Sequence, residues 1–197
     1  MIEIIKDYQL QTSRTDTNLD SCLKNETHYI LGFITEFGEL SDGYKKQLAY
    51  NKELDFVNVG EEWADFGWYL GRYTQLLLKE LNITSDEYYD YLIEFGYDHF
   101  DNFFAEIMLD EYEKDVVKPM LLTSFIPALN KVMENQDKES LLIFTSWWWT
   151  LGKELGINRE KALSNNLNKL KLRYPEKFTS ENAINRDLDG ERKILES

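Results

Sequence analysis

Apolar residues recur at helical spacing along most of the chain. Around residues 27–49 they include Phe33, Phe37 and Leu40, which lie three or four positions apart. Such spacing predicts amphipathic helices, and only 3 prolines among 197 residues are present to interrupt them. The predicted helices cover residues 2–12, 27–49, 56–81, 84–95, 103–117, 121–134, 139–155 and 158–173. The expected fold class is therefore all-α, a helical bundle.

Loop and stop signals separate the predicted helices. The polar stretch from Thr12 to Asn25 predicts a loop, and Tyr50 to Asp55 predicts a turn. A break is expected over residues 96–102. Pro119 is expected to end one helix, and Pro127 to start or kink the next.

Small and very large residues within these helices predict close packing. Gly38, Gly67 and Gly71 each cost about 1 kcal/mol of helix propensity relative to alanine, so we expect them where neighbouring helices approach closely. The run of three tryptophans at 147–149 lies in a strongly apolar segment and is expected in the core. Base stacking is the alternative for these rings.

Two acidic motifs interrupt the apolar faces of the first two long helices. They are Glu36-x-x-Glu39 and Glu62-x-x-Asp65. Residues three apart share a helix face, so two antiparallel helices would bring four carboxylates together. Their repulsion and desolvation require a neutralising cation, and Mg²⁺ prefers oxygen ligands. The motifs predict a Mg²⁺ site, with Mn²⁺ as a substitute, in which the four acids are both metal ligands and catalytic residues.

Composition limits the partners of such a site. A net charge of −14 argues against a polymeric nucleic acid, whereas a metal would let a small phosphorylated substrate approach the acids. The lone Cys22 cannot form an internal disulfide. No apolar run approaches about 20 residues, and Met1 to Lys6 lacks the pattern of a secretory signal. We expect a cytoplasmic protein without a membrane partner.

Several further motifs accompany the acids in a fixed order. They are Tyr8-Gln9, Arg14-Thr15, Glu36 to Leu40, Lys45-Lys46, Glu61 to Leu70, Leu155 to Ile157, Asn166 to Leu170, Arg173 to Pro175 and Asn185 to Asp187. In order and spacing they resemble the MazG-like branch of the all-α nucleoside triphosphate pyrophosphohydrolases. The resemblance implies Mg²⁺-dependent hydrolysis of a (d)NTP to the monophosphate and pyrophosphate, for nucleotide pool control or house-cleaning.

Six polar residues are candidates for binding the substrate. The resemblance implies this role for Arg14, Lys45, Lys46, Asn166, Lys169 and Arg173. Asn166, Lys169 and Arg173 share one helical face, and arginine suits phosphate oxygens. Spacing alone favours a solvated polar face, whereas the resemblance favours phosphate binding. Trp68 and Tyr69 are expected in the core, with the border of a base pocket as the alternative.

The chain departs from the resembling family at two places. Some relatives carry a glutamate where this chain has Thr35, so a base role does not transfer to that position. The stretch from Glu87 to Trp149 is an insertion. Relatives usually pair two chains, so a homodimer is expected; the alternative is that this insertion supplies the second half of the bundle.

An internal repeat is one interpretation of the insertion. Leu77 to Ile83 resembles Leu151 to Ile157, which suggests related halves at about 27–95 and 103–173 within one domain at 1–178, followed by a polar tail at 179–197. That register places four residues opposite the acids: Asp110, Glu113, Gln136 and Glu139. A chance match between two helix ends is the alternative.

Two other classes of protein compete with the enzyme hypothesis. A di-iron bundle would need Glu-x-x-His pairs, and neither His28 nor His99 follows a glutamate by three positions. A non-catalytic module that binds nucleotides or proteins, with a vestigial metal site, would not require all four acids. Because the four acids are intact, the enzyme is the preferred hypothesis.

Overall fold

The computed structural model describes residues 2–95 and 114–197. Within these ranges all regular structure is helical, which confirms the all-α class. The α-helices are α1 (Ile2–Thr12), α2 (Cys22–Tyr50), α3 (Phe56–Leu81), α4 (Ser85–Phe95), α6 (Lys114–Thr123), α7 (Phe125–Asn135), α8 (Lys138–Glu154), α9 (Arg159–Arg173), α10 (Ser180–Ile184) and α11 (Leu188–Glu196), and η1 (Ser13–Thr15) is a 3₁₀ helix. None of the described helices is long and apolar enough to cross a lipid bilayer.

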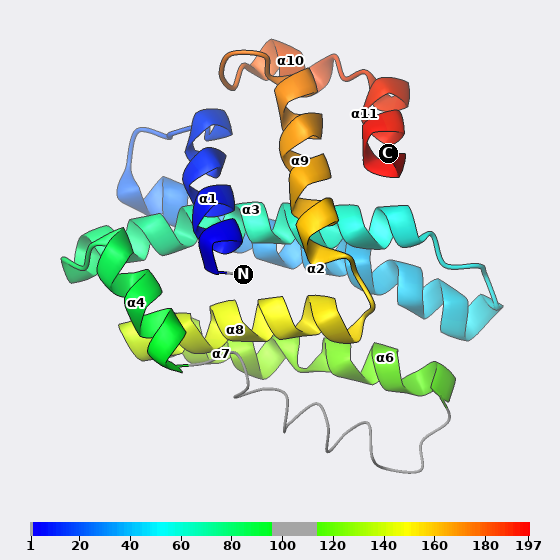
Figure 1. Cartoon of the computed structure of the whole chain (residues 1–197), viewed down its shortest axis with the longest axis horizontal. Helices are drawn as coiled ribbons and strands as arrows, with labels where there is room; N and C mark the ends of the chain where they lie inside the picture. Colours follow the sequence, from blue (N-terminus) through cyan, green and yellow to red (C-terminus); the bar gives the residue numbers. More distant parts are fainter. Residues whose placement is uncertain (1, 96–113) are drawn as a thin grey trace.

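The long helices α2 and α3 form an antiparallel pair through the middle of the molecule (Figure 1). On one side, α9 crosses α3, with α1 alongside it and α11 packed against it. On the other side lie α6, α7 and α8. The described part of the insertion therefore covers one side of the central pair. That it replaces a second chain, and hence the oligomeric state, stays a prediction.

Side-chain caps fix the ends of the central pair. Ser21 accepts a hydrogen bond from Lys24 N, so α2 begins earlier than predicted. The Asp55 side chain accepts hydrogen bonds from the first amides of α3, and the bounds of α3 agree with the prediction. Both helices end at an asparagine in the left-handed conformation, Asn51 at φ 50° and Asn82 at φ 55°, a conformation that asparagine tolerates better than most residues.

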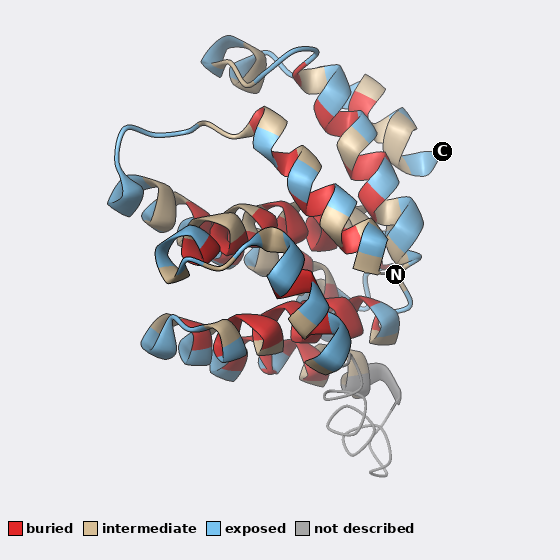
Figure 2. Ribbon diagram, turned by 60° about the vertical axis from the view of Figure 1, so that its left-hand side comes forward, coloured by how far each residue is buried: buried red, intermediate tan, exposed pale blue. Residues whose placement is uncertain are grey.

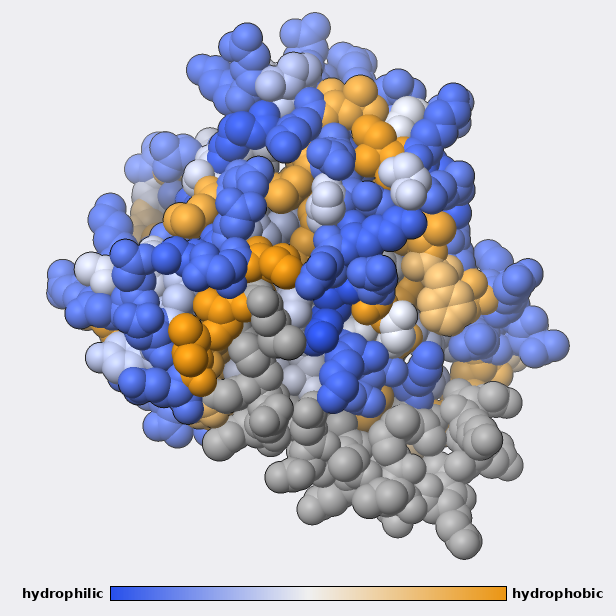
Figure 3. Space-filling view, in the orientation of Figure 1, coloured by the Kyte–Doolittle hydropathy of each residue, from blue (hydrophilic) through white to orange (hydrophobic). Residues whose placement is uncertain are grey.

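Aromatic side chains fill the core between the two sides. Buried residues line the facing sides of the helices (Figure 2). Phe33 of α2 lies 5.3 Å from Phe66 of α3 between ring centroids, and 5.4 Å from Phe144 of α8. The tryptophans at 147–149 are at most 2% exposed, which confirms their predicted place in the core. Hydrophilic residues cover most of the face in Figure 3, with smaller hydrophobic groups between them.

Helices α3 and α8 cross through a reciprocal tryptophan pair. Trp63 Nε1 donates to Trp148 O, and Trp148 Nε1 donates to Trp63 O, each at 3.0 Å. The two indoles stack at 4.5 Å with 8° between their planes. A Cβ built on Gly67 would lie 2.3 Å from the Trp148 ring, and one on Gly152 would lie 2.6 Å from the Trp63 ring. Each tryptophan therefore packs against the glycine that follows its partner tryptophan by four residues.

Two of the three predicted close approaches at glycine are confirmed. Gly67 contacts Trp148, and a Cβ at Gly71 would lie 3.0 Å from the Gln9 side chain of α1. The prediction for Gly38 is wrong, because no atom of the described residues lies within 4 Å of a Cβ there. Gly38 is on an exposed part of α2.

The tryptophan pair relates the hairpin of α2 and α3 to the hairpin of α7 and α8, whether or not the two share an origin. Trp63 and Trp148 are 85 positions apart in the sequence. Asn51 and Gln136, the left-handed caps that end α2 and α7, are separated by the same number of positions. This separation differs from the one between Leu77 and Leu151, on which the predicted repeat was based. In the register of the tryptophans, Glu62 and Asp65 stand opposite two buried residues, Trp147 and Thr150. Asp110 and Glu113 lie outside the described residues, and the duplication stays a prediction.

One predicted helix end was wrong. Helix α6 continues through Pro119 to Thr123, because Leu121 and Leu122 are buried and their packing outweighs one lost backbone hydrogen bond. The predicted polar tail contains α10 and α11, since Asp187 caps α11 and α11 packs against α9. The predicted break at 96–102 and most of the predicted helix at 103–117 lie outside the described residues.

Candidate metal and substrate site

Three of the four predicted acids converge between α2 and α3. Glu36 of α2, together with Glu62 and Asp65 of α3, offers carboxylate oxygens that all lie within 4.8 Å of one another. Glu62 is buried, whereas Glu36 and Asp65 are half-buried. Glu39 lies one turn beyond Glu36, is exposed, and lines the same cavity outside the triad. The antiparallel pair therefore brings both motifs to one place, as predicted.

Crowding makes the charged form of these acids costly. Burial, followed by the negative charges of Asp65 and Glu39, raises the pKa of Glu36 to about 7. Burial and the same two charges raise the pKa of Glu62 to about 9. A bare triad would thus hold protons near neutral pH, and a bound dication would allow it to ionise.

Asp65 is held on its inner side by α9. Asn166 Nδ2 donates to one carboxylate oxygen at 2.6 Å, and Lys169 Nζ donates to the other at 2.5 Å. Lys169 also contacts Glu61 at 3.0 Å. Burial lowers the pKa of Lys169, but the charges of Asp65 and Glu61 outweigh this effect and raise it, so the lysine is charged. Asn166 and Lys169 are 0% exposed, so both are directed at the acids and not at the cavity.

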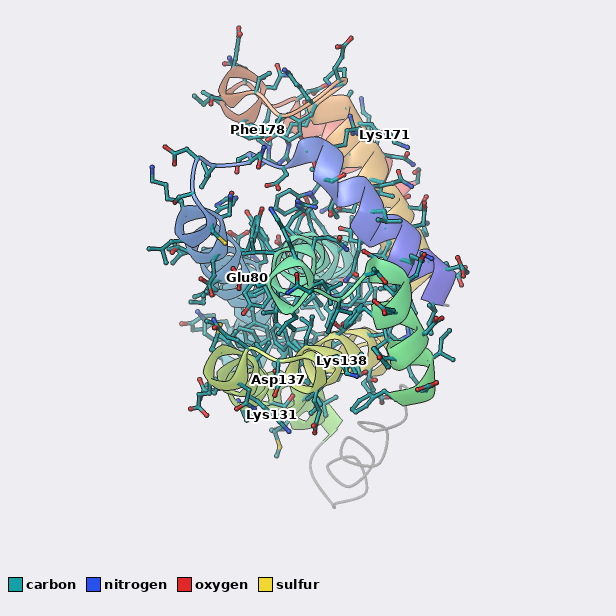
Figure 4. The ribbon with its side chains drawn as sticks, turned by 90° about the vertical axis from the view of Figure 1, so that its left-hand side faces the viewer. Glu80, Lys131, Asp137, Lys138, Lys171 and Phe178 are labelled. Atoms are coloured by element: carbon teal, nitrogen blue, oxygen red, sulfur yellow. The ribbon has the colours of Figure 1, made fainter. Side chains whose placement is uncertain are left out.

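A cavity of about 410 Å³ opens in front of the triad. Its size falls within the range of small-molecule sites. Its aromatic wall consists of His28, Trp68, Tyr69, Tyr174 and Phe178. Trp68 is buried in the core, as predicted, and Tyr69 is packed against the core. Both also line the cavity; that it binds a base stays a prediction. Figure 4 shows Phe178 on the other side of α9 from Lys171, which lies away from this cavity.

Two arginines and one buried glutamate form the cationic side of the cavity. Arg173 donates to Glu191 of α11 through Nε at 2.8 Å and Nη2 at 2.6 Å. Arg186 donates to the same carboxylate at 2.6 Å. Burial raises the pKa of Glu191, but the hydrogen bonds from both arginines outweigh this effect and lower it to about 2. Two guanidiniums on one carboxylate leave a net positive charge beside the cavity.

The remaining predicted substrate residues lie elsewhere. Arg14 Nη1 donates to Tyr174 O at 2.7 Å and thereby caps the end of α9, without lining the cavity. Lys45 and Lys46 both pair with Asp42 on the surface of α2. Lys46 lines a separate shallow hollow together with Glu39 and Glu62.

Sequence reasoning did not assign several residues of this site. Glu61 pairs with Lys169. Its position next to Glu62 in the sequence was the signal that could have placed it near the site. Arg186 belongs to the Asn185-Arg186-Asp187 motif but was given no role. Glu191 lies in a segment that is polar throughout, and no pattern there indicated burial. The aromatic residues Tyr174 and Phe178 also gave no separate signal.

The donor set fits a hard divalent cation. Three carboxylates offer oxygen atoms at close range, which suits Mg²⁺ or Mn²⁺. Softer ions prefer sulfur or imidazole ligands, and the described part of the cavity offers only His28, which is not part of the carboxylate triad.

Comparison of the chain with protein-family models, with curated proteins and with solved structures gives no match in any of the three searches.

Proposed function

We propose that the protein is a Mg²⁺-dependent pyrophosphohydrolase that converts a (d)NTP to the monophosphate and pyrophosphate. The observation that carries the proposal is the convergence of Glu36, Glu62 and Asp65 in the lining of a cavity with an aromatic wall. Raised pKa values at Glu36 and Glu62 support it, because such shifts accumulate at functional sites. The MazG-like resemblance supplies the reaction class.

The acids would divide into ligands and a proton acceptor. Glu36, Glu62 and Asp65 would hold the cation. Bound Mg²⁺ would supply a Lewis acid for phosphoryl oxygens and lower the pKa of a coordinated water. Glu39 lines the cavity outside the triad, so its carboxylate is free to accept a proton from the attacking water.

The lining of the cavity suits both parts of a nucleotide. Arg173 and Arg186 share one glutamate, so positive charge remains for phosphate oxygens. The aromatic wall offers apolar faces on which a base can stack. Guanidiniums and rings in one cavity support a nucleoside triphosphate over inorganic pyrophosphate as the substrate.

A substrate panel tests this proposal directly. Each (d)NTP is incubated with the protein and Mg²⁺, and monophosphate, pyrophosphate and orthophosphate are quantified. At least one nucleotide should give equal amounts of monophosphate and pyrophosphate, and Glu62→Gln and Asp65→Asn should abolish the release. Glu53→Gln, at an exposed position in the loop before α3, is the matched control and should keep full activity.

Two results would contradict the proposal. Orthophosphate as the first product would place cleavage at the wrong phosphate. An absence of turnover with every nucleotide, combined with nucleotide binding, would favour the non-catalytic module.

A further inference from the structure

We infer that Tyr8 of α1 is a positioning residue for this site, acting through the Asn166 amide on Asp65. This inference rests on the proposed function. The Tyr8 hydroxyl lies 2.8 Å from Asn166 Oδ1, and Asn166 Nδ2 lies 2.6 Å from Asp65. A chain of hydrogen bonds therefore runs from the first helix of the protein to a predicted metal ligand.

The orientation of the Asn166 amide decides how it meets Asp65. An amide can present either NH₂ or oxygen to a neighbour. With the NH₂ towards Asp65, its oxygen faces Tyr8 and accepts the hydroxyl proton. Asn166 is 0% exposed, so without Tyr8 this oxygen would be buried and without its donor. Rotation of the amide would then become more favourable and would disturb the position of Asp65.

Tyr8 is suited to donate at every pH at which the protein would work. It is 1% exposed, and its one hydroxyl proton is shared between two acceptors, Asn166 Oδ1 at 2.8 Å and Ala64 O at 2.7 Å. Burial, followed by the charges of Asp65 and Glu36, raises its pKa well above the ordinary value, so the proton stays on the oxygen. Because Ala64 precedes Asp65, one hydroxyl contacts both the backbone beside this ligand and the amide that holds it.

This arrangement also changes the role expected of α9. Asn166 and Lys169 each bond to a different oxygen of Asp65 from the interior. The remaining acceptor directions of that carboxylate are left for the cation that it would share with Glu36 and Glu62. Partners behind a metal ligand typically contribute 10–100-fold to metal affinity. Tyr8, Asn166 and Lys169 therefore hold the ligand, and phosphate binding falls to Arg173 and Arg186.

The test compares two buried tyrosines in the full chain. Tyr8→Phe removes the hydroxyl that bonds Asn166. Tyr44→Phe is the matched control, because Tyr44 is also 1% exposed and its buried hydroxyl has no hydrogen-bond partner among the described residues. Mn²⁺ binding is measured for both by titration with paramagnetic resonance detection, and folding is checked by circular dichroism and thermal unfolding.

Tyr8→Phe should weaken Mn²⁺ binding by about 10–100-fold, while Tyr44→Phe should bind as the wild type does. Asn166→Leu should cause a loss of similar size. The double variant of Tyr8 and Asn166 should lose no more than Asn166→Leu alone, because the two residues act in series. This double-variant cycle keeps the test valid if one single variant loses thermal stability.

The outcomes separate the inference from the function on which it rests. If the wild type binds Mn²⁺ and Tyr8→Phe binds it equally well, the inference is wrong and the proposed function stands. Fully additive losses in the double variant would also overturn it. If the wild type does not bind Mn²⁺, the metal site itself is wrong, and the inference is overturned with it.

Discussion

Trp63 and Trp148 exchange hydrogen bonds: each indole nitrogen donates to the backbone carbonyl of the other residue at 3.0 Å. A carbonyl within a helix already accepts one bond from its own helix, and its second lone pair accepts the indole proton. Both buried N–H groups are thereby satisfied without water. Since Trp63 immediately follows Glu62, this contact also fixes the part of α3 that carries the acids.

The glycines under these rings should resist substitution. Alanine in place of a helical glycine ordinarily stabilises by about 1 kcal/mol. Gly67→Ala and Gly152→Ala should instead destabilise by about 1–3 kcal/mol, because the added methyl would overlap an indole. Gly38→Ala is the control and should stabilise, since its Cβ meets nothing within 4 Å. Chemical denaturation measures all three; stabilisation at Gly67 would contradict the packing described.

Glu39 and Glu36 should differ in their roles. Glu36→Gln removes an oxygen from the triad, so both Mn²⁺ affinity and turnover should fall by at least about tenfold. Glu39→Gln leaves the triad intact, so Mn²⁺ affinity should stay within a few-fold while turnover falls by about 10²–10⁴. Titration and pyrophosphate release measure the two effects. Equal loss of Mn²⁺ affinity in both variants would make Glu39 a ligand.

The stability of the metal-free protein should fall as pH rises. Glu36 and Glu62 have pKa values of about 7 and about 9 in the fold, above the ordinary value of 4.5. Between 4.5 and those values the folded chain binds more protons than the unfolded chain. The free energy of unfolding therefore decreases with increasing pH across this window.

Mg²⁺ should reverse this trend, because it replaces the protons on the acids. Thermal unfolding in chelator should show a lower midpoint at pH 8 than at pH 6, and Mg²⁺ should raise the midpoint more at pH 8. The unfolding midpoint of Glu62→Gln should depend less on pH and on Mg²⁺ than that of the wild type. An equal effect of Mg²⁺ at the two pH values would show that no proton is displaced.

Glu191 should stabilise the C-terminal helices through its two arginines. Glu191→Gln leaves Arg173 and Arg186 without a counter-charge and should cost about 1–3 kcal/mol at neutral pH, less than a fully buried pair because Arg186 is partly exposed. Glu196→Gln on the same helix breaks an exposed pair with Arg192 and should cost at most about 0.5 kcal/mol.

Acid should remove this contribution. The pKa of Glu191 is about 2 in the folded protein and 4.5 in the unfolded chain. The stabilisation is therefore fully present above pH 4.5 and is lost as the pH falls towards 2. The difference in unfolding free energy between the wild type and Glu191→Gln should shrink over that range. A difference that is constant from pH 6 to pH 2 would contradict the ion pair.

The central helices and their acids were predictable because local signals agreed with tertiary packing. Asp55 and Asn82 mark both ends of α3, and its apolar spacing gives the buried face. Glutamate within such a face is unusual enough to indicate a site. The direction of Asn166 and Lys169 was not predictable, since a polar helix face looks the same whether it meets a phosphate or an aspartate.

Other features depend on contacts between distant segments. Glu191 is buried only because Arg173 and Arg186 reach it, and no periodicity records that. Pro119 would stop an isolated helix, but the packing of Leu121 and Leu122 overrides it. The pairing of Trp63 with Trp148 was also not predictable, because it depends on which faces of α3 and α8 pack together.

The guanidinium of Arg14 joins the beginning of the chain to its late part through the carbonyl of Tyr174. Thr15 and Tyr174 both line the cavity, so one bond connects two of its walls. A ribosome would release α2 and α3, with all four motif acids, before α9. Asp65 would therefore lack Asn166 and Lys169, its hydrogen-bond partners on α9, until that helix had been synthesised.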